Sequence, residues 1–155
     1  MKKMNEQILA DYAQQLLGID SPTGFSQHAI TWIEEQVQAL GYICYRNAKG
    51  NLIVEIEGPV DQPVVAVSAH TDTLGLMVRA IKKDGKLAFT RLGGPCLPTL
   101  DGEYCRIITR QGKVYTGTIL SMAPAVHVYK EASSQERSEE TMEVRIDELV
   151  RNEED

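Results

Sequence analysis

An apolar run that ends in two polar side chains constrains the fold of this chain more than any other feature. Pro63–Ala69 is almost continuously apolar, and His70 and Asp72 follow it directly. Such a run is typical of an interior strand, because the strands of parallel sheets are covered on both faces. Ligands bind in open α/β sheets outside the carboxyl ends of such strands, which is where the polar pair would lie. The run therefore predicts an α/β domain with a site at this strand end.

The residues before this run predict two helices and a hairpin. Apolar side chains recur at helical spacing over residues 4–17, and again between Ser26, which can cap a helix, and Gly41. The turn Asn47–Asn51 then separates two short segments with strand character. Two helices, a hairpin and a buried strand together indicate a layered α/β arrangement.

Short strand-like segments dominate the second half of the chain. Two more hairpins are predicted around Lys82–Gly85 and Arg110–Lys113, and residues 142–146 predict a further strand. Asp147 can cap a short final helix. Closely spaced short strands are typical of a small β-barrel or sandwich, so we place a domain boundary near residues 72–75.

Composition and charge narrow the class of protein. Hydrophobic residues make up 43% of the 155 residues and charged residues 25%, as in ordinary soluble domains. Residues 131–155 carry ten acidic and three basic side chains, a net charge of -7, whereas residues 1–130 are close to neutral and the whole chain has a formal net charge of -6. We therefore expect no nucleic-acid partner, and the absence of a long apolar stretch predicts no membrane span. The irregularly spaced cysteines favour reduced thiols in a cytoplasmic protein; they are Cys44, Cys96 and Cys105.

His70 and Asp72 are the candidate metal-site residues. At positions i and i+2 of an extended chain, both side chains point to the same side. Neutral imidazole is a good zinc ligand, and a metal-bound histidine usually donates its second N–H to a carboxylate or carbonyl. Asp72 could orient His70 in this way, or it could bind metal itself. By spacing alone the pair is a weak signal, because a structural histidine beside an aspartate shows the same pattern.

Several short motifs follow one another in a specific order along essentially the whole chain. They are Asp20–Gly24, Ala48–Leu52, Ala69–Asp72, Gly75–Arg79, Arg91–Gly94 and Val114–Ile119. In this order they resemble the glutamyl aminopeptidase family, which includes the deblocking and tetrahedral aminopeptidases. No single motif decides the resemblance.

The resemblance implies a fold and an activity. Residues 1–72 would be the N-terminal part of a peptidase-type α/β/α layered catalytic domain. Residues 73–155 would form an inserted β-rich, barrel-like dimerisation domain that is incomplete or just ending, and hence a homo-oligomer. The implied activity removes N-terminal residues from peptide substrates by two-metal hydrolysis with zinc, cobalt or manganese. The resemblance assigns His70 as a metal ligand and Asp72 as a catalytic residue that supports the site.

The sequence also departs from the family pattern. Where the family commonly has Asp-Glu, this chain has Asp72 followed by Thr73, which removes one carboxylate near the site. The family's later metal ligands and its general base would lie beyond Asp155. We therefore expect an N-terminal fragment that is inactive alone, whether a truncated product or part of a split enzyme. His127 is expected to be structural or on the surface.

Two other interpretations stay open at the level of sequence. The β-rich part could be a non-catalytic module that self-associates. A different peptidase or deacylase family could also share the strand-end His-x-Asp motif and be completed by a partner chain. If the later strands of the sheet are missing, Pro63–Ala69 would have an unpaired edge, and we expect residues 1–72 to be poorly stable alone unless a partner covers them.

Overall fold

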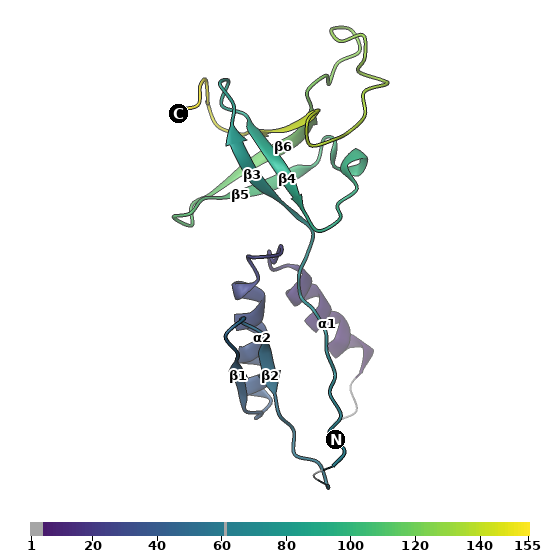
Figure 1. Cartoon of the computed structure of the whole chain (residues 1–155), viewed down its shortest axis with the longest axis vertical. Coiled ribbons are helices and arrows are strands. Elements are labelled where there is room, and N and C mark those ends of the chain that lie inside the picture. The colour runs from purple at the N-terminus through teal and green to yellow at the C-terminus, as the bar shows by residue number, and fades with distance from the viewer. Residues whose placement is uncertain (1–4, 61) are drawn as a thin grey trace. The chain divides into compact units, whose positions relative to one another are not determined.

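The structure, a computed structural model, describes residues 5–60 and 62–155 (Figure 1). The chain divides into two compact units, Met1–Gly75 and Leu76–Asp155, each of which is described by itself. Among the described residues, no helix is long and apolar enough to cross a membrane. The elements in chain order are α1 (Glu6–Leu17), α2 (Gln27–Ala39), β1 (Cys44–Arg46), β2 (Leu52–Val54), β3 (Gly75–Ile81), β4 (Leu87–Leu92), the 3-10 helix η1 (Leu97–Leu100), β5 (Tyr104–Ile108), β6 (Val114–Ser121) and β7 (Met142–Ile146).

The first unit consists of two helices and a short hairpin. Asn5 begins α1, because its side-chain oxygen accepts a hydrogen bond from the Ile8 N–H at 2.8 Å and satisfies a free donor of the first turn. Helix α2 contacts α1 and also the hairpin. Tyr12 of α1 and Trp32 of α2 meet edge to face, with ring centroids 6.0 Å apart. Both helices predicted from periodicity are confirmed, and Trp32 packs between them.

The predicted hairpin is also confirmed. Strands β1 and β2 are antiparallel, with Tyr45 opposite Ile53. Asn47 closes the turn, because its side-chain oxygen accepts hydrogen bonds from the N–H groups of Lys49 and Asn51, both at 3.0 Å. This is the local chemistry that makes asparagine frequent in turns.

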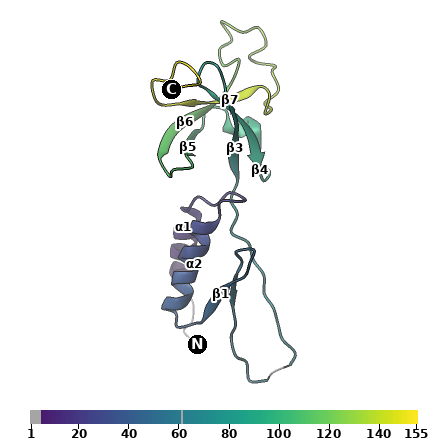
Figure 2. The same cartoon turned by 60° about the vertical axis from the view of Figure 1, so that its left-hand side comes forward.

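The predicted interior strand over Pro63–Ala69 is not observed. No described strand pairs with this segment, and the side chains of Val64, Val65 and Val67 are exposed. Figure 2 shows it within a long excursion that follows β2. A strand needs neighbours that take up its backbone hydrogen bonds, and the elements described here supply none for this run. The apolar composition of this run predicts a buried strand, but such a strand forms only where neighbouring strands are present.

The second unit is a five-stranded sheet in the order β3-β4-β7-β6-β5. The last strand, β7, lies in the middle and pairs antiparallel with β4 and β6, so that Val144 faces Leu87 on one side and Ile119 on the other. In Figure 2, β3 and β4 diverge from β5 and β6 with β7 at the junction, so the sheet is curled. A closed, barrel-like sheet is not observed, because β3 and β5 stay at the two edges of the described sheet.

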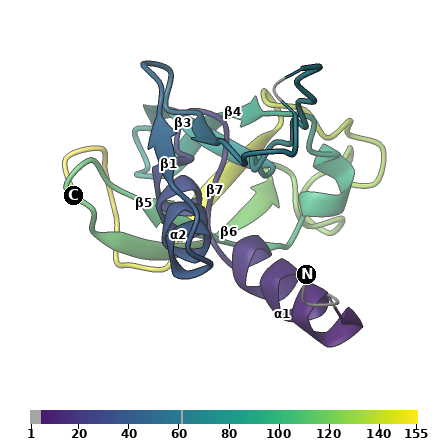
Figure 3. The same ribbon diagram turned by 90° about the horizontal axis from the view of Figure 1, so that it is seen from below.

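The core of the second unit is a cluster of buried apolar side chains from the sheet and from η1. Phe89 and Met142 are its most deeply buried large side chains. The remaining members of the buried cluster are Leu87, Leu97, Ile119 and Val144. The long connection between β6 and β7, seen beside η1 in Figure 3, is tied down by Arg137, whose Nε donates to Asp101 Oδ2 at 2.7 Å.

The final helix expected after Asp147 is not formed; residues 147–155 contain only bends and turns. The carboxylate of Asp155 accepts hydrogen bonds from the N–H groups of Arg151 and Asn152, at 2.7 and 3.2 Å. Val150 also packs so closely on Gly85 that a Cβ at Gly85 would lie 2.1 Å from Val150 Cγ1. These contacts hold the tail in a turn against the β3–β4 connection.

Candidate functional site

His70 and Asp72 form a direct side-chain pair in the first unit. His70 Nδ1 lies 2.7 Å from Asp72 Oδ1, so the carboxylate can accept the Nδ1 proton. The His70 side chain is 85% exposed, which leaves its second nitrogen, Nε2, open to solvent. With the proton on Nδ1, Nε2 carries a lone pair. This geometry is the one in which a carboxylate orients a metal-binding histidine.

The chain just after this pair is attached to the loop before α2. The Thr73 N–H donates to the Ser21 carbonyl at 2.8 Å, and the Ser21 N–H donates to Thr73 Oγ1 at 3.3 Å. Pro22 and Thr73 form an isolated parallel bridge. A Cβ at Gly75 would lie 2.6 Å from Pro22 Cβ, so only glycine permits this approach. We call the contact of Ser21–Thr23 with Asp72–Thr73 the clasp.

Two hydroxyl groups of the clasp differ in their surroundings. Thr23 Oγ1 faces Asp72 Oδ2 at 3.5 Å, on the side of the carboxylate away from His70. Ser21 is 1% exposed, and its Oγ has no hydrogen-bond partner among the residues that the structure describes. Asp72 is thus contacted at both oxygens, by the His70 ring and by the Thr23 hydroxyl.

Comparison with known families identifies the type of protein that contains this pair. Residues 50–155 match the family model described as M42 glutamyl aminopeptidase. The chain belongs to the M42 glutamyl aminopeptidase family. The resemblance inferred from the ordered motifs is therefore confirmed.

Curated M42-type relatives are longer than this chain. YhfE of Bacillus subtilis (strain 168), an aminopeptidase by name, is 44% identical over 137 residues, which cover 88% of this chain and 40% of YhfE. The glutamyl aminopeptidase of Lactococcus lactis subsp. cremoris (strain MG1363) is 30% identical over 106 residues, covering 68% of this chain and 30% of that protein. The chain therefore spans less than half the length of these relatives.

Solved structures share the fold. The TET aminopeptidase of the marine sediment archaeon Thaumarchaeota archaeon SCGC AB-539-E09 matches with a TM-score of 0.81 at 24% identity, over 94% of this chain and 39% of that one. The Pyrococcus horikoshii TET1 peptidase, which can assemble into a tetrahedron or a large octahedral shell, matches with a TM-score of 0.74 at 21% identity. This match covers 94% of this chain and 42% of the TET1 chain. At these identities the likeness shows the fold alone.

The residues present fit one corner of a metal centre. Among residues 5–60 and 62–155, no three histidine, cysteine, aspartate or glutamate side chains lie close enough together to hold a metal ion. A zinc site takes about three protein ligands even when one position is open for catalysis. The exposed Nε2 of His70, with Nδ1 held by Asp72, suits a single ligand of such a site.

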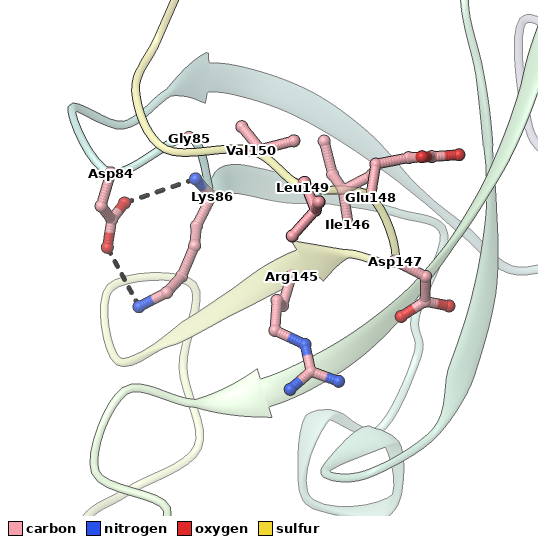
Figure 4. A pocket seen from close by; sticks show the side chains of 9 residues that line it. All are labelled: Asp84, Gly85, Lys86, Arg145, Ile146, Asp147, Glu148, Leu149 and Val150. Atoms are coloured by element: carbon pink, nitrogen blue, oxygen red, sulfur yellow. Dashed lines mark hydrogen bonds and ion pairs between the residues drawn. The ribbon is translucent and has the colours of Figure 1, made fainter. Parts of the chain in front are cut away.

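A hollow in the second unit is a less suitable place for a ligand. Lys86 Nζ lies 2.8 Å from Glu143 Oε1 and 3.0 Å from Asp84 Oδ2, and these contacts, that with Glu143 first, raise the pKa of Lys86. In Figure 4 the Arg145 and Asp147 side chains point away from the Lys86–Asp84 pair. The hollow is lined by Asp84, Gly85, Lys86, Arg145, Ile146, Asp147, Glu148, Leu149 and Val150. Since its lysine is already matched by carboxylates, we interpret this cluster as structural.

Sequence reasoning found the pair but missed the clasp. The Asp20–Gly24 motif contributes only to the family resemblance, because Thr23 and Asp72 are 49 positions apart and nothing in either segment indicates that they meet. Thr73 was noted only for the carboxylate that it lacks, whereas its hydroxyl accepts a hydrogen bond from Ser21. Of the two expectations for His127, structural or on the surface, the second holds, because it is exposed in the turn after β6.

Proposed function

We propose that this chain supplies the first metal ligand, His70, and its supporting catalytic carboxylate, Asp72, to a two-metal aminopeptidase site. The enzyme would remove N-terminal residues from peptides. The observation that carries the proposal is the 2.7 Å contact between His70 Nδ1 and Asp72 Oδ1, which leaves Nε2 exposed. Membership of the M42 glutamyl aminopeptidase family supports the assignment of this pair to peptide hydrolysis.

Each residue of the pair has a distinct role. His70 would bind a divalent metal through Nε2; zinc, cobalt and manganese all accept imidazole together with carboxylates. Asp72 would keep the proton on Nδ1, align the ring and make Nε2 a stronger ligand. When bound, the two metals would supply Lewis-acid polarisation of the scissile carbonyl and activation of water near neutral pH.

The proposal includes inactivity of the 155 residues by themselves. Because no three potential ligands lie together among the described residues, we expect no turnover by the purified chain with added zinc, cobalt or manganese. A panel of aminoacyl-anilide substrates measures this directly. Turnover that disappears in His70→Ala would show that the chain forms a working site without further residues.

A chimera tests the ligand role in a complete protein. The matched 137 residues of this chain replace their counterparts in YhfE, and turnover of YhfE itself is measured first. We expect an active chimera whose His70→Ala variant falls to background. The control is His28→Ala, because His28 is exposed at the start of α2, where it meets Phe25 edge to face. Full turnover by the His70→Ala chimera would refute the ligand assignment.

We also propose that the second unit mediates self-association, as an inserted dimerisation domain. The edge strand β3 exposes Met77 and Val78, and open apolar edge strands readily pair with another chain. The TET1 peptidase of Pyrococcus horikoshii, which shares the fold, forms large assemblies. Light scattering should show an oligomer that dissociates in Val78→Lys. An oligomeric YhfE chimera that binds no metal would favour the non-catalytic assembly module over the peptidase.

A further inference from the structure

We propose that Thr23 and Thr73 are positioning residues that fix the orientation of Asp72 on His70 through the clasp. This inference rests on the proposed function, because it assigns roles within the same site. It differs from that function in one respect: it concerns the proton on His70 before any metal binds. It can therefore be tested on the metal-free chain.

The segment that carries His70 has little else to hold it. Residues 62–70 lie outside every described strand, and all of them are exposed. At Asp72–Thr73 this changes, because Thr73 exchanges two hydrogen bonds with Ser21. Gly75 also approaches Pro22 closely, next to these hydrogen bonds. The clasp is thus the contact that gives Asp72 a defined position.

Thr23 acts on the rotation of the Asp72 carboxylate. Oδ1 receives the His70 Nδ1 proton at 2.7 Å, whereas Oδ2 faces the Thr23 hydroxyl at 3.5 Å. A hydroxyl that donates to Oδ2 restrains the terminal torsion of the aspartate, which is otherwise broad. With Oδ2 held, Oδ1 stays directed at the imidazole.

Thr73 acts on the backbone that carries Asp72. Its Oγ1 accepts the Ser21 N–H at 3.3 Å, and its own N–H donates to the Ser21 carbonyl. An acidic side chain at this position would bring a second negative charge next to Asp72. Threonine instead holds the loop with a neutral acceptor, so the His70 proton has a single carboxylate partner in the clasp.

The consequence is a preferred tautomer of neutral His70. A carboxylate aimed at Nδ1 favours the form with the proton on Nδ1 and the lone pair on Nε2. If Asp72 is free to rotate, the proton redistributes toward Nε2, and fewer molecules present the Nε2 lone pair to a metal. The clasp would therefore prepare the ligand before binding.

Nitrogen NMR of the metal-free 155-residue chain tests this inference. Long-range proton–nitrogen spectra, recorded at alkaline pH where histidine side chains are neutral, report the tautomer of His70. We expect mainly the Nδ1–H form in the parent, and a shift of the tautomer ratio toward Nε2–H of about twofold or more in Thr23→Val and Thr73→Val. Thr23→Ser, which restores the hydroxyl, should return the parent ratio, and Thr116→Val on β6 should leave it unchanged.

The outcomes separate the clasp from the proposed function. A parent without the Nδ1–H preference, or unchanged ratios in both valine variants, would overturn the inference. A shifted ratio together with an active His70→Ala chimera would keep the clasp and reject the metal role. If Thr73→Val disturbs the fold, as amide spectra would show, Thr23→Val decides the matter alone, because the Thr23 side chain is exposed.

Discussion

Two equally buried serines show how hydrogen bonding determines what a single residue contributes to stability. Ser21 and Ser121 are both 1% exposed. Ser121 Oγ donates to Gln135 Oε1 at 2.9 Å and accepts from the Ala123 N–H at 3.1 Å, whereas Ser21 Oγ has no partner among the described residues. A buried polar group without a partner costs free energy, and a paired one contributes about 1 kcal/mol.

We therefore expect opposite effects from the same substitution. Ser121→Ala should lower the free energy of unfolding of the second unit by about 1–2 kcal/mol, because it also leaves Gln135 and the Ala123 N–H unpaired. Ser21→Ala should be neutral or slightly stabilising for the first unit. Urea denaturation followed by hydrogen exchange measures both units separately. Equal losses in the two variants would contradict this account of the clasp.

Glu139 makes the second unit sensitive to acid. Its carboxylate accepts hydrogen bonds from the Arg91 N–H at 2.9 Å, the Thr90 hydroxyl at 3.0 Å and Arg91 Nε at 3.1 Å. The Arg91 backbone N–H is the main cause that holds its pKa below the ordinary 4.5. Because the folded pKa is the lower one, the stabilisation is complete above about 4.5 and is lost as pH falls through the folded value.

Replacement of Glu139 by glutamine should remove this pH dependence. We expect Glu139→Gln to unfold at a lower urea concentration at neutral pH, and to lose less stability than the parent between pH 7 and about 3.5. The neighbouring Glu140→Gln serves as control, because the Glu140 side chain is 72% exposed and its oxygen is 3.9 Å from Arg79. Identical acid sensitivity in the Glu139→Gln variant and the parent would rule out this origin.

At the scale of elements, a buried carboxylate joins the β3–β4 hairpin to β7. Glu143 is 6% exposed, and its two oxygens lie 2.8 Å from Lys82 Nζ and 2.8 Å from Lys86 Nζ. Glu143→Gln should destabilise the sheet by about 1–3 kcal/mol, because two lysines lose a charged acceptor. Hydrogen exchange of the β7 amides measures the loss, with the exposed Glu148→Gln as control. Unchanged protection of the β7 amides from exchange in Glu143→Gln would mean that these ion pairs do not stabilise the sheet.

Elements that depend on local chemistry were predicted well. Helices α1 and α2 follow from apolar periodicity, and the hairpin turns follow from residues such as Asn47 that bond to their own backbone. The predicted strand over Pro63–Ala69 is wrong, because a strand also requires neighbouring strands, and composition does not reveal them. The expected final helix was wrong because Asp155 and Val150 hold the tail in another arrangement.

In the candidate site, too, the local contact is predictable from the sequence and the long-range contact is not. The approach of His70 to Asp72 follows from their spacing of two residues on an extended chain. The clasp joins residues about 50 positions apart, and no periodicity or motif in either segment indicates that contact. The barrel-like closure of the second unit likewise depended on pairing between distant strands, and the described sheet stays open between β3 and β5.

On the scale of the whole molecule, the two units differ in how much they bury. The second unit has a contiguous apolar cluster around Phe89 and Met142. In the first unit, helix α1 has no buried residue and α2 buries only Ala29. Since apolar burial is the main favourable term in folding, the first unit should open at lower free energy.

Limited proteolysis should therefore cut the first unit first. We expect early cleavage within residues 62–70, which are exposed and outside any strand, followed by survival of a fragment that contains residues 76–155. Mass spectrometry of the time course identifies the fragments. Equal resistance of both units would contradict the expected difference in stability.

The central claim is that His70, oriented by Asp72, is a ligand of a two-metal site. The most direct measurement is the number of metal ions per chain in the YhfE chimera, determined by elemental analysis after extensive dialysis. We predict about two ions in the chimera and about one fewer in its His70→Ala variant, with His28→Ala unchanged. An unaltered metal content in His70→Ala would contradict the claim.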